Sequence, residues 1–156
     1  MTHRPPAGLP AVLAAGLEHT LTEHGPVSSL AEAAATRGVD PSRLLKSLVV
    51  RRGEDDYLFV LVPGGRSISW PKLRALLGVN RLSMPPAAEA LEVTGYPRGS
   101  ITPFGATTAW PVIADLTVTG GPVSIGAGAP GAAVTVDADR LVEALEATRA
   151  DVTDPE

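Results

Sequence analysis

The chain has 156 residues, of which 44% are hydrophobic and 19% charged, as expected of a globular protein with a single domain over residues 1–156 and not of a disordered chain. Its formal net charge of −4 argues against a protein that coats a long nucleic acid, which needs a basic surface, but not against contact with the end of one. The absence of cysteine excludes disulfides, thiolate nucleophiles and cysteine-bearing zinc sites.

Membrane attachment and export are also disfavoured. No run of apolar residues reaches the ~18 that a membrane span requires, and residues 1–10 lack the basic start and apolar core of a secretory signal. We therefore expect a cytoplasmic protein without a membrane partner. Only 4% of the residues are aromatic, so stacking of bases on an aromatic platform is disfavoured as well.

The first half of the chain predicts two helices followed by a hairpin. Apolar residues at helical spacing predict a helix over 9–24. A capping box, Ser-Leu-Ala-Glu at 29–32, predicts a second helix over 29–38. Two apolar runs, 44–52 and 57–62, are separated by a short polar turn, which is typical of antiparallel strands.

The second half continues to alternate helices and strands. Ser-Trp-Pro at 69–71 predicts the cap and first turn of a helix that Gly78 ends, and Pro85-Pro86 opens another that runs through Leu91. Three strands and a helix are expected after that, at 110–115, 122–125, 132–136 and 140–148, with frayed ends at 2–7 and 153–156. Helices interleaved with hairpins predict the α/β class, with helices packed around one mixed, mostly antiparallel sheet.

A loop over 94–108 is too long for a simple connector, and loops beyond ~12 residues in small domains are usually functional or disordered. It contains three apolar side chains, Tyr96, Ile101 and Phe104, so we expect it to be ordered. Glycines let backbone amides approach a ligand closely, and prolines hold those amides in place. Such fixed donors suit an oxyanion formed during acyl transfer. The alternative is a turn-rich crossover without a ligand.

Lys46 is one of only two lysines among 13 basic residues. Strand alternation places it on the face that carries Leu44, Leu48 and Val50. If that face is buried, the ammonium needs an anion or a polar ligand, because desolvating a lone charge costs several kcal/mol. The alternative is a lysine that extends its ammonium to the surface.

The segment 126–131 spells G-x-G-x-x-G, the pattern of dinucleotide-binding loops. That fingerprint requires a helix after the glycines, whereas residues 132–136 read as a strand, so we expect a hairpin whose glycines line a pocket. The three histidines lie in the N-terminal segment, away from the loop. With no metal-ligating cluster or nucleophile elbow in the sequence, we expect no metal and no cofactor.

Four features in this order resemble the YbaK/ProX family of aminoacyl-tRNA deacylases, which are related to the editing domain of bacterial prolyl-tRNA synthetase. They are the strand lysine, the segment GYPRGSITPFG at 95–105, a strand ending in Asp115 and the hairpin glycines. The resemblance covers residues 29–151 and implies a YbaK-type fold. It also implies hydrolysis of a mischarged aminoacyl-tRNA that carries a small amino acid, of the Cys-tRNA(Pro) or Ala-tRNA(Pro) type, with the ribose 2′-hydroxyl or the substrate side chain assisting.

The resemblance also implies the site residues. Lys46, Gly99 and Pro103 are expected to carry the reaction. Substrate contacts are expected from the loop, the strands and the hairpin, at Ser47, Tyr96, Ser100, Ile101, Thr102, Phe104, Gly105, Asp115, Gly126 and Gly128. The implied partner is the acceptor end of an aminoacyl-tRNA, with prolyl-tRNA synthetase as a further partner and no DNA.

Two departures from the family pattern affect the site. Ser100 stands where many members carry glycine, and Ala129-Pro130 stand where a basic residue is common. Two alternatives therefore stay open beside the deacylase. One is a non-catalytic module of the same fold that binds an aminoacyl or nucleotide ligand, and the other is a small-molecule esterase.

Overall fold

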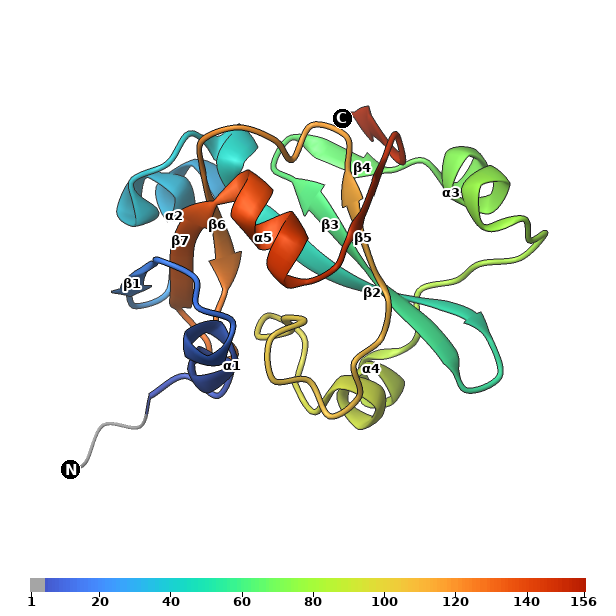
Figure 1. The fold of residues 1–156 in the computed structure, drawn as a ribbon, viewed down its shortest axis with the longest axis horizontal. Coiled ribbons are helices and arrows are strands. Elements are labelled where there is room, and N and C mark those ends of the chain that lie inside the picture. The colour runs from blue at the N-terminus through green and yellow to red at the C-terminus, as the bar shows by residue number, and fades with distance from the viewer. Residues whose placement is uncertain (1–4) are drawn as a thin grey trace.

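The computed structural model describes residues 5–156, whose strands fall into three sheets (Figure 1). A mixed four-stranded sheet has the order β2 (Leu45–Gly53), β3 (Asp56–Pro63), β5 (Val112–Asp115) and β8 (Thr148–Ala150). An antiparallel three-stranded sheet has the order β1 (Thr20–Glu23), β7 (Ala132–Asp137) and β6 (Pro122–Gly126). A short ribbon pairs β4 (Arg66–Ile68) with β9 (Thr153–Pro155).

The central strand β3 explains the order of the larger sheet. Its side chains are buried from Tyr57 to Pro63, a continuous apolar run that suits a strand covered on both faces. β2 pairs with it antiparallel, and Lys46 lies opposite Val62 in this register. β5 pairs with β3 in parallel. A parallel bridge between Leu44 and Ser124 connects this sheet to β6, so the start of β2 lies beside the smaller sheet.

The helices begin where the sequence places their caps. The side chains of Ser29, Ser69 and Asp137 accept hydrogen bonds from backbone amides in the first turns of α2 (Leu30–Arg37), α3 (Trp70–Leu77) and α5 (Ala138–Ala144). Two further helices are α1 (Leu9–Ala14) and α4 (Ala87–Thr94), and a 3-10 turn spans Pro41–Arg43.

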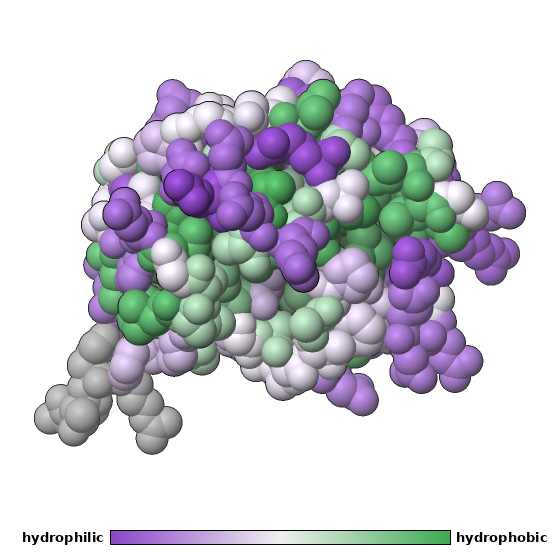
Figure 2. Space-filling view, viewed as in Figure 1, coloured by the Kyte–Doolittle hydropathy of each residue, from purple (hydrophilic) through white to green (hydrophobic). Residues whose placement is uncertain are grey.

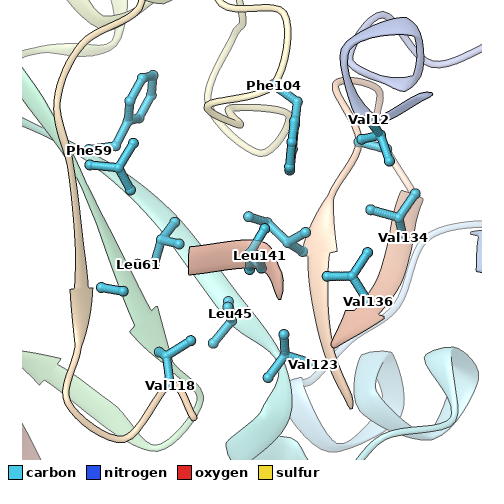
Figure 3. Packing of buried hydrophobic residues seen from close by; sticks show 14 of the residues in the cluster. Val12, Leu45, Phe59, Leu61, Phe104, Val118, Val123, Val134, Val136 and Leu141 are labelled. Carbon is cyan, nitrogen blue, oxygen red and sulfur yellow. The ribbon is translucent and has the colours of Figure 1, made fainter. Parts of the chain in front are cut away.

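The main core lies between the two larger sheets and is centred on α5. Figure 3 shows Leu141 of α5 between Leu45 and Leu61 of the larger sheet and Val136 of the smaller one, with the ring of Phe104 pointing toward them. A second cluster fills the opposite face of the larger sheet, against α3. The 94–108 loop lies beside α4 and is coloured yellow in Figure 1. It reaches the core through Phe104, which is 3% exposed.

The predicted α/β class is confirmed, but the expectation of one sheet is wrong. The helix expected over 9–24 ends at Ala14, because Gly16 adopts a left-handed φ of 70°. The residues after that turn join the smaller sheet as strand β1, which pairs with β7. The threonines at 20 and 22 suit a strand better than a helix.

The C-terminal part also differs from the expectation. The helix expected over 140–148 runs from Ala138 to Ala144, and Thr148 belongs to β8. Residues 153–155 are not frayed, because β9 pairs with β4 and the Glu156 amide donates to the Gly65 carbonyl at 2.9 Å. Of the other end expected to fray, residues 2–4 lie outside the described part. Within residues 5–156, no helix has the length and apolar character to cross a membrane.

Candidate active site

A cavity of about 370 Å³ opens between β2, α4, β6 and the 94–108 loop. Most of its wall is apolar and comes from Leu44, Leu45, Leu48, Val49, Met84, Pro85, Ala90 and Ile101. Its polar side chains are Arg37, Lys46, Ser47 and Arg98, and two glycines, Gly99 and Gly126, complete it. An apolar wall with a few convergent polar groups is the usual character of a small-ligand site.

Two residues of the 94–108 loop that line this cavity, Gly99 and Ile101, have free backbone amides. The amides of Gly99 and Ile101 donate no hydrogen bond to the described part of the chain. Gly99 has a φ of 90°, and a side chain there would meet no atom within 4 Å, so glycine is required by the backbone conformation and not by crowding. These two amides are available as donors of the kind that the sequence predicted for an oxyanion.

Buried hydrogen bonds hold the loop in this shape. The Tyr96 hydroxyl donates to the Phe104 carbonyl at 2.6 Å, and the Trp110 indole donates to the Val93 carbonyl at 2.7 Å. At the start of the loop, the Thr94 hydroxyl donates to the Ala90 carbonyl and accepts from the Tyr96 amide. Burial raises the pKa of Tyr96, so its hydroxyl keeps its proton and remains a donor at neutral pH.

Two serine hydroxyls beside the loop are buried without a partner. Within residues 5–156, the Oγ atoms of Ser47 and Ser100 make no hydrogen bond, although a buried hydroxyl left unpaired costs about 1–3 kcal/mol. Ser47 lines the cavity, and Ser100 is 5% exposed and follows Gly99 in the loop. An unpaired hydroxyl at a cavity wall is suited to a polar atom of a ligand.

The Lys46 side chain lies at the rim of the site. It contributes to the cavity wall, but its ammonium donates to the Arg66 carbonyl at 3.1 Å and lies 3.7 Å from the Glu156 carboxylate. Its side chain is 38% exposed, so it matches the predicted alternative of an ammonium that reaches the surface. The ion pair with Glu156 is solvent-exposed and therefore weak and easily exchanged for another anion.

Arg37 is a site residue that the sequence reasoning missed. It ends α2 and reaches the cavity, where its guanidinium makes only long contacts, 3.4 Å to the Ser124 hydroxyl and 3.5 Å to His24 Nε2. No carboxylate of the described chain pairs with it, and burial lowers its pKa. A desolvated cation without a carboxylate partner is a candidate site for an anion. An arginine in the last turn of a helix is otherwise common, so the sequence alone gave no signal.

Asp115 does not line the cavity. Its carboxylate is 1% exposed and accepts hydrogen bonds from the Thr117 amide, the Val152 amide and the Thr153 hydroxyl. Burial by itself raises the pKa of Asp115. The hydrogen bonds together lower it by more than burial raises it, so the pKa of Asp115 lies below the ordinary value. The carboxylate therefore fixes the C-terminal strand against the sheet.

The other predicted residues divide into cavity wall and support. Lys46, Ser47, Gly99, Ile101 and Gly126 come together at the cavity. The remaining loop and hairpin residues lie behind it and do not line it; these are Tyr96, Ser100, Thr102, Pro103, Phe104, Gly105 and Gly128.

Close packing explains the glycines of the support. A Cβ on Gly128 would lie 2.7 Å from the Gly8 nitrogen and 2.9 Å from the Tyr96 ring, and one on Gly105 would lie 2.9 Å from the Tyr96 hydroxyl. These glycines therefore let the N-terminal segment and the hairpin pack directly against the loop.

The cavity can bind and polarise a carbonyl group but offers no protein base. No histidine, aspartate or glutamate is among the residues that line it, so Ser47 has no neighbouring group to activate it as a nucleophile. Within residues 5–156, no three metal-ligating side chains gather around a common point. The chemistry that the site supports by itself is orientation and stabilisation of an oxyanion.

Comparison with solved structures agrees with this fold. A crystal structure described as a "putative trans-editing enzyme for prolyl tRNA synthetase" superimposes with a TM-score of 0.86 at 25% identity, over 97% of this chain and 99% of that one. A crystal structure of a hypothetical protein superimposes with a TM-score of 0.85 at 29% identity, over 95% of this chain and 99% of the other.

Sequence relatives include bacterial proline--tRNA ligases. That of Pelobacter propionicus is 32% identical over 117 residues, which are 75% of this chain and 20% of the ligase. That of Thermosipho melanesiensis is 39% identical over 88 residues, which are 56% of this chain and 15% of the ligase. The chain thus spans a fifth or less of the length of these ligases.

The family model for the aminoacyl-tRNA editing domain matches residues 24–144, most of the chain. The chain belongs to this family, and the resemblance to YbaK/ProX proteins is confirmed. Its role is accordingly in tRNA editing.

Proposed function

We propose that this protein is a hydrolase that removes a small, wrongly attached amino acid from tRNA, of the Ala-tRNA(Pro) or Cys-tRNA(Pro) type. The observation that carries the proposal is that two residues with unbonded backbone amides, Gly99 and Ile101, line a cavity of about 370 Å³. The cavity has room for a small amino acid and part of a ribose, because small-ligand sites begin at about 300 Å³. The similarity to segments of proline--tRNA ligases supports tRNA(Pro) as the carrier.

The proposed reaction uses the substrate's own groups where the protein supplies none. Water attacks the ester carbonyl carbon while the amides of Gly99 and Ile101 stabilise the developing oxyanion. The bond to the ribose 3′-oxygen then breaks, and this oxygen takes a proton, leaving free amino acid and tRNA. The neighbouring 2′-hydroxyl orients the water and relays its proton, and in a cysteinyl substrate the thiol assists in the same way. Positioning by a rigid site supplies the rest of the acceleration.

The charged side chains at the cavity hold the RNA end and not the reacting bond. Arg37 has no carboxylate partner and suits the phosphate that precedes the terminal adenosine. When the RNA binds, the Lys46 ammonium exchanges its contact with the exposed Glu156 carboxylate for a contact with a polar group of the same nucleotide. The unpaired Ser47 hydroxyl accepts or donates a hydrogen bond at the aminoacyl group.

A single-turnover deacylation screen tests the proposal. Purified tRNA(Pro) is charged in separate samples with alanine, cysteine, serine or proline, and amino-acid release is followed with wild type and with Lys46→Ala. The deacylase predicts rapid release of at least one small non-cognate amino acid and slow release by the variant. Binding of the charged tRNA without any release contradicts the hydrolase and identifies a binding module. Equal rates on alanine methyl ester and Ala-tRNA(Pro) identify a small-molecule esterase.

A further inference from the structure

A second hollow, separate from the cavity, gathers four of the protein's arginines. It has a volume of about 550 Å³ and is lined by Arg51 and Arg52 of β2, Arg74 of α3 and Arg81 of the segment after α3. Its remaining lining residues, Gly53, Asn80, Leu82 and Ser83, are uncharged. In a chain with a formal net charge of −4, a hollow lined by four cations and no acid is a local reversal of charge.

The charges of this arginine hollow are only partly neutralised. Arg52 forms a two-point ion pair with Asp56 at 2.9 and 3.0 Å, and Arg51 lies 3.8 Å from Glu89. By contrast, no hydrogen bond or ion pair engages the side chains of Arg74 and Arg81 within the described chain. The hollow therefore keeps an excess of two positive charges. Figure 2 shows hydrophilic side chains gathered at this end of the molecule, over the β2–β3 turn and the segment after α3.

Two adjacent segments connect the arginine hollow to the cavity. Along β2, residues 44–49 line the cavity and residues 51–53 line the hollow. Along the segment after α3, residues 80–83 line the hollow and Met84 and Pro85 line the cavity. The two segments are fixed to each other by hydrogen bonds between the backbones of Arg51 and Ser83, at 2.8 and 3.1 Å. At about 3.3 Å per strand residue, the five residues from Lys46 to Arg51 place the start of the hollow roughly 17 Å from Lys46.

We propose that the arginine hollow binds the phosphate backbone of the RNA whose aminoacylated end occupies the cavity. A strand of about five stacked nucleotides, at ~3.4 Å each, spans the separation between the two sites. Arginine is suited to this because its planar guanidinium binds phosphate oxygens in pairs. Phosphate contacts of this kind fix the position of the nucleic acid and carry no sequence information. This inference rests on the proposed function only for the identity of the RNA.

Salt dependence of binding tests the inference without relying on catalysis. The probe is uncharged tRNA(Pro), and its dissociation constant is measured between 50 and 200 mM salt for wild type, Arg74→Gln, Arg81→Gln and the double variant. Each lost phosphate contact reduces the slope of log affinity against log salt by about 0.7–0.9. Raising the salt from 50 to 200 mM should therefore weaken tRNA binding about tenfold less in the double variant than in wild type. Arg140→Gln is the matched control, because it removes one exposed arginine that lines a different hollow, and it keeps the wild-type slope.

A kinetic comparison separates this inference from the proposed function. The ratio of kcat/KM on Ala-tRNA(Pro) to kcat/KM on alanyl-adenosine falls about tenfold in the double variant if the hollow holds RNA, and stays unchanged in Arg140→Gln. Wild-type salt slopes in both single variants and the double variant overturn the inference, even if the protein deacylates tRNA. Loss of binding to a synthetase with an unchanged tRNA slope also overturns it, because the hollow then holds a protein. Reduced slopes with no hydrolysis by wild type support the hollow and contradict the hydrolase.

Discussion

Two hairpin glycines, Gly126 and Gly128, lie two residues apart and should respond oppositely to the same added methyl group. Gly126 lines the cavity, and the nearest atom to an added Cβ is the Ile101 carbonyl oxygen at 3.8 Å, an ordinary contact. Gly128 has a φ of 90°, and an added Cβ would lie 2.7 Å from the Gly8 nitrogen and 2.9 Å from the Tyr96 ring. Gly126→Ala therefore changes the cavity, whereas Gly128→Ala changes the packing behind it.

The expected magnitudes follow from these contacts. Gly126→Ala should leave the free energy of unfolding unchanged or raise it by about 0.5–1 kcal/mol, because alanine reduces the freedom of the unfolded chain. Gly128→Ala should lower the free energy of unfolding by about 2–4 kcal/mol. The left-handed backbone conformation costs alanine about 1–2 kcal/mol, and overpacking of the added methyl group against fixed backbone accounts for the rest. For a chain of this length, that loss lowers the Tm by roughly 5–15 °C.

Urea or thermal unfolding measures the stabilities, and single-turnover deacylation measures the site. In Gly126→Ala, the methyl group should reduce the rate on the largest accepted amino acid about 10-fold or more while sparing alanine, since one methylene is worth 1–3 kcal/mol in an apolar pocket. Equal stability losses in both variants, or an unchanged preference in a well-folded Gly126→Ala, would refute the assignment of Gly126 to the wall and Gly128 to the support.

Three further substitutions test the roles of charged residues. Lys46→Ala should reduce kcat/KM for aminoacyl-tRNA about tenfold or more, because it removes a charged contact to the terminal nucleotide. It should change the free energy of unfolding by less than about 1 kcal/mol, because its ion pair with Glu156 is exposed; unfolding of the variant would contradict this. Arg37→Gln should raise KM for aminoacyl-tRNA about tenfold in steady-state kinetics and leave stability unchanged or higher, because it removes a desolvated charge that lacks a carboxylate partner; a KM equal to that of wild type would remove Arg37 from the site. Asp115→Asn should lower the free energy of unfolding by about 2–3 kcal/mol at pH 7. Hydrogen bonds hold the pKa of Asp115 below its unfolded value near 4. The ionised carboxylate therefore contributes fully to the free energy of unfolding above about pH 4, and this contribution is lost as the pH falls through the folded pKa. In urea unfolding, the free energies of wild type and Asp115→Asn should converge in acid. A difference that grows on acidification would contradict the buried-carboxylate account.

Local signals in the sequence predicted those parts of the fold that depend on neighbouring residues. The predicted caps at Ser29 and Ser69 each satisfy an amide within three residues, so the starts of their helices are encoded locally. The β2–β3 hairpin is likewise local. The number of sheets was not predictable in this way, because it depends on pairings such as β1 with β7, more than a hundred residues apart.

The site was predictable to the extent that a backbone motif encodes it. The glycines and prolines of the 94–108 loop indicated fixed amides, and the structure places Gly99 and Ile101 at the cavity. Arg37 was missed because its position at the cavity is set by the packing of Ala33 and Ala34 of α2 against Leu44, which one sequence does not reveal. Asp115 was expected to contact substrate because of the family resemblance, and the structure shows its carboxylate bonded to residues 117, 152 and 153 instead.

In the proposed reaction, main-chain donors of the protein and a hydroxyl of the substrate are the groups that promote cleavage of the acyl bond. The most direct measurement compares single-turnover release of alanine from ordinary Ala-tRNA(Pro) with release from Ala-tRNA(Pro) whose terminal adenosine lacks the 2′-hydroxyl. Assistance by that hydroxyl predicts a rate at least 100-fold lower for the deoxy substrate at equal binding affinity, the usual size of a general acid–base contribution. Equal rates on the two substrates would contradict the account and require a proton-transferring group of the protein itself.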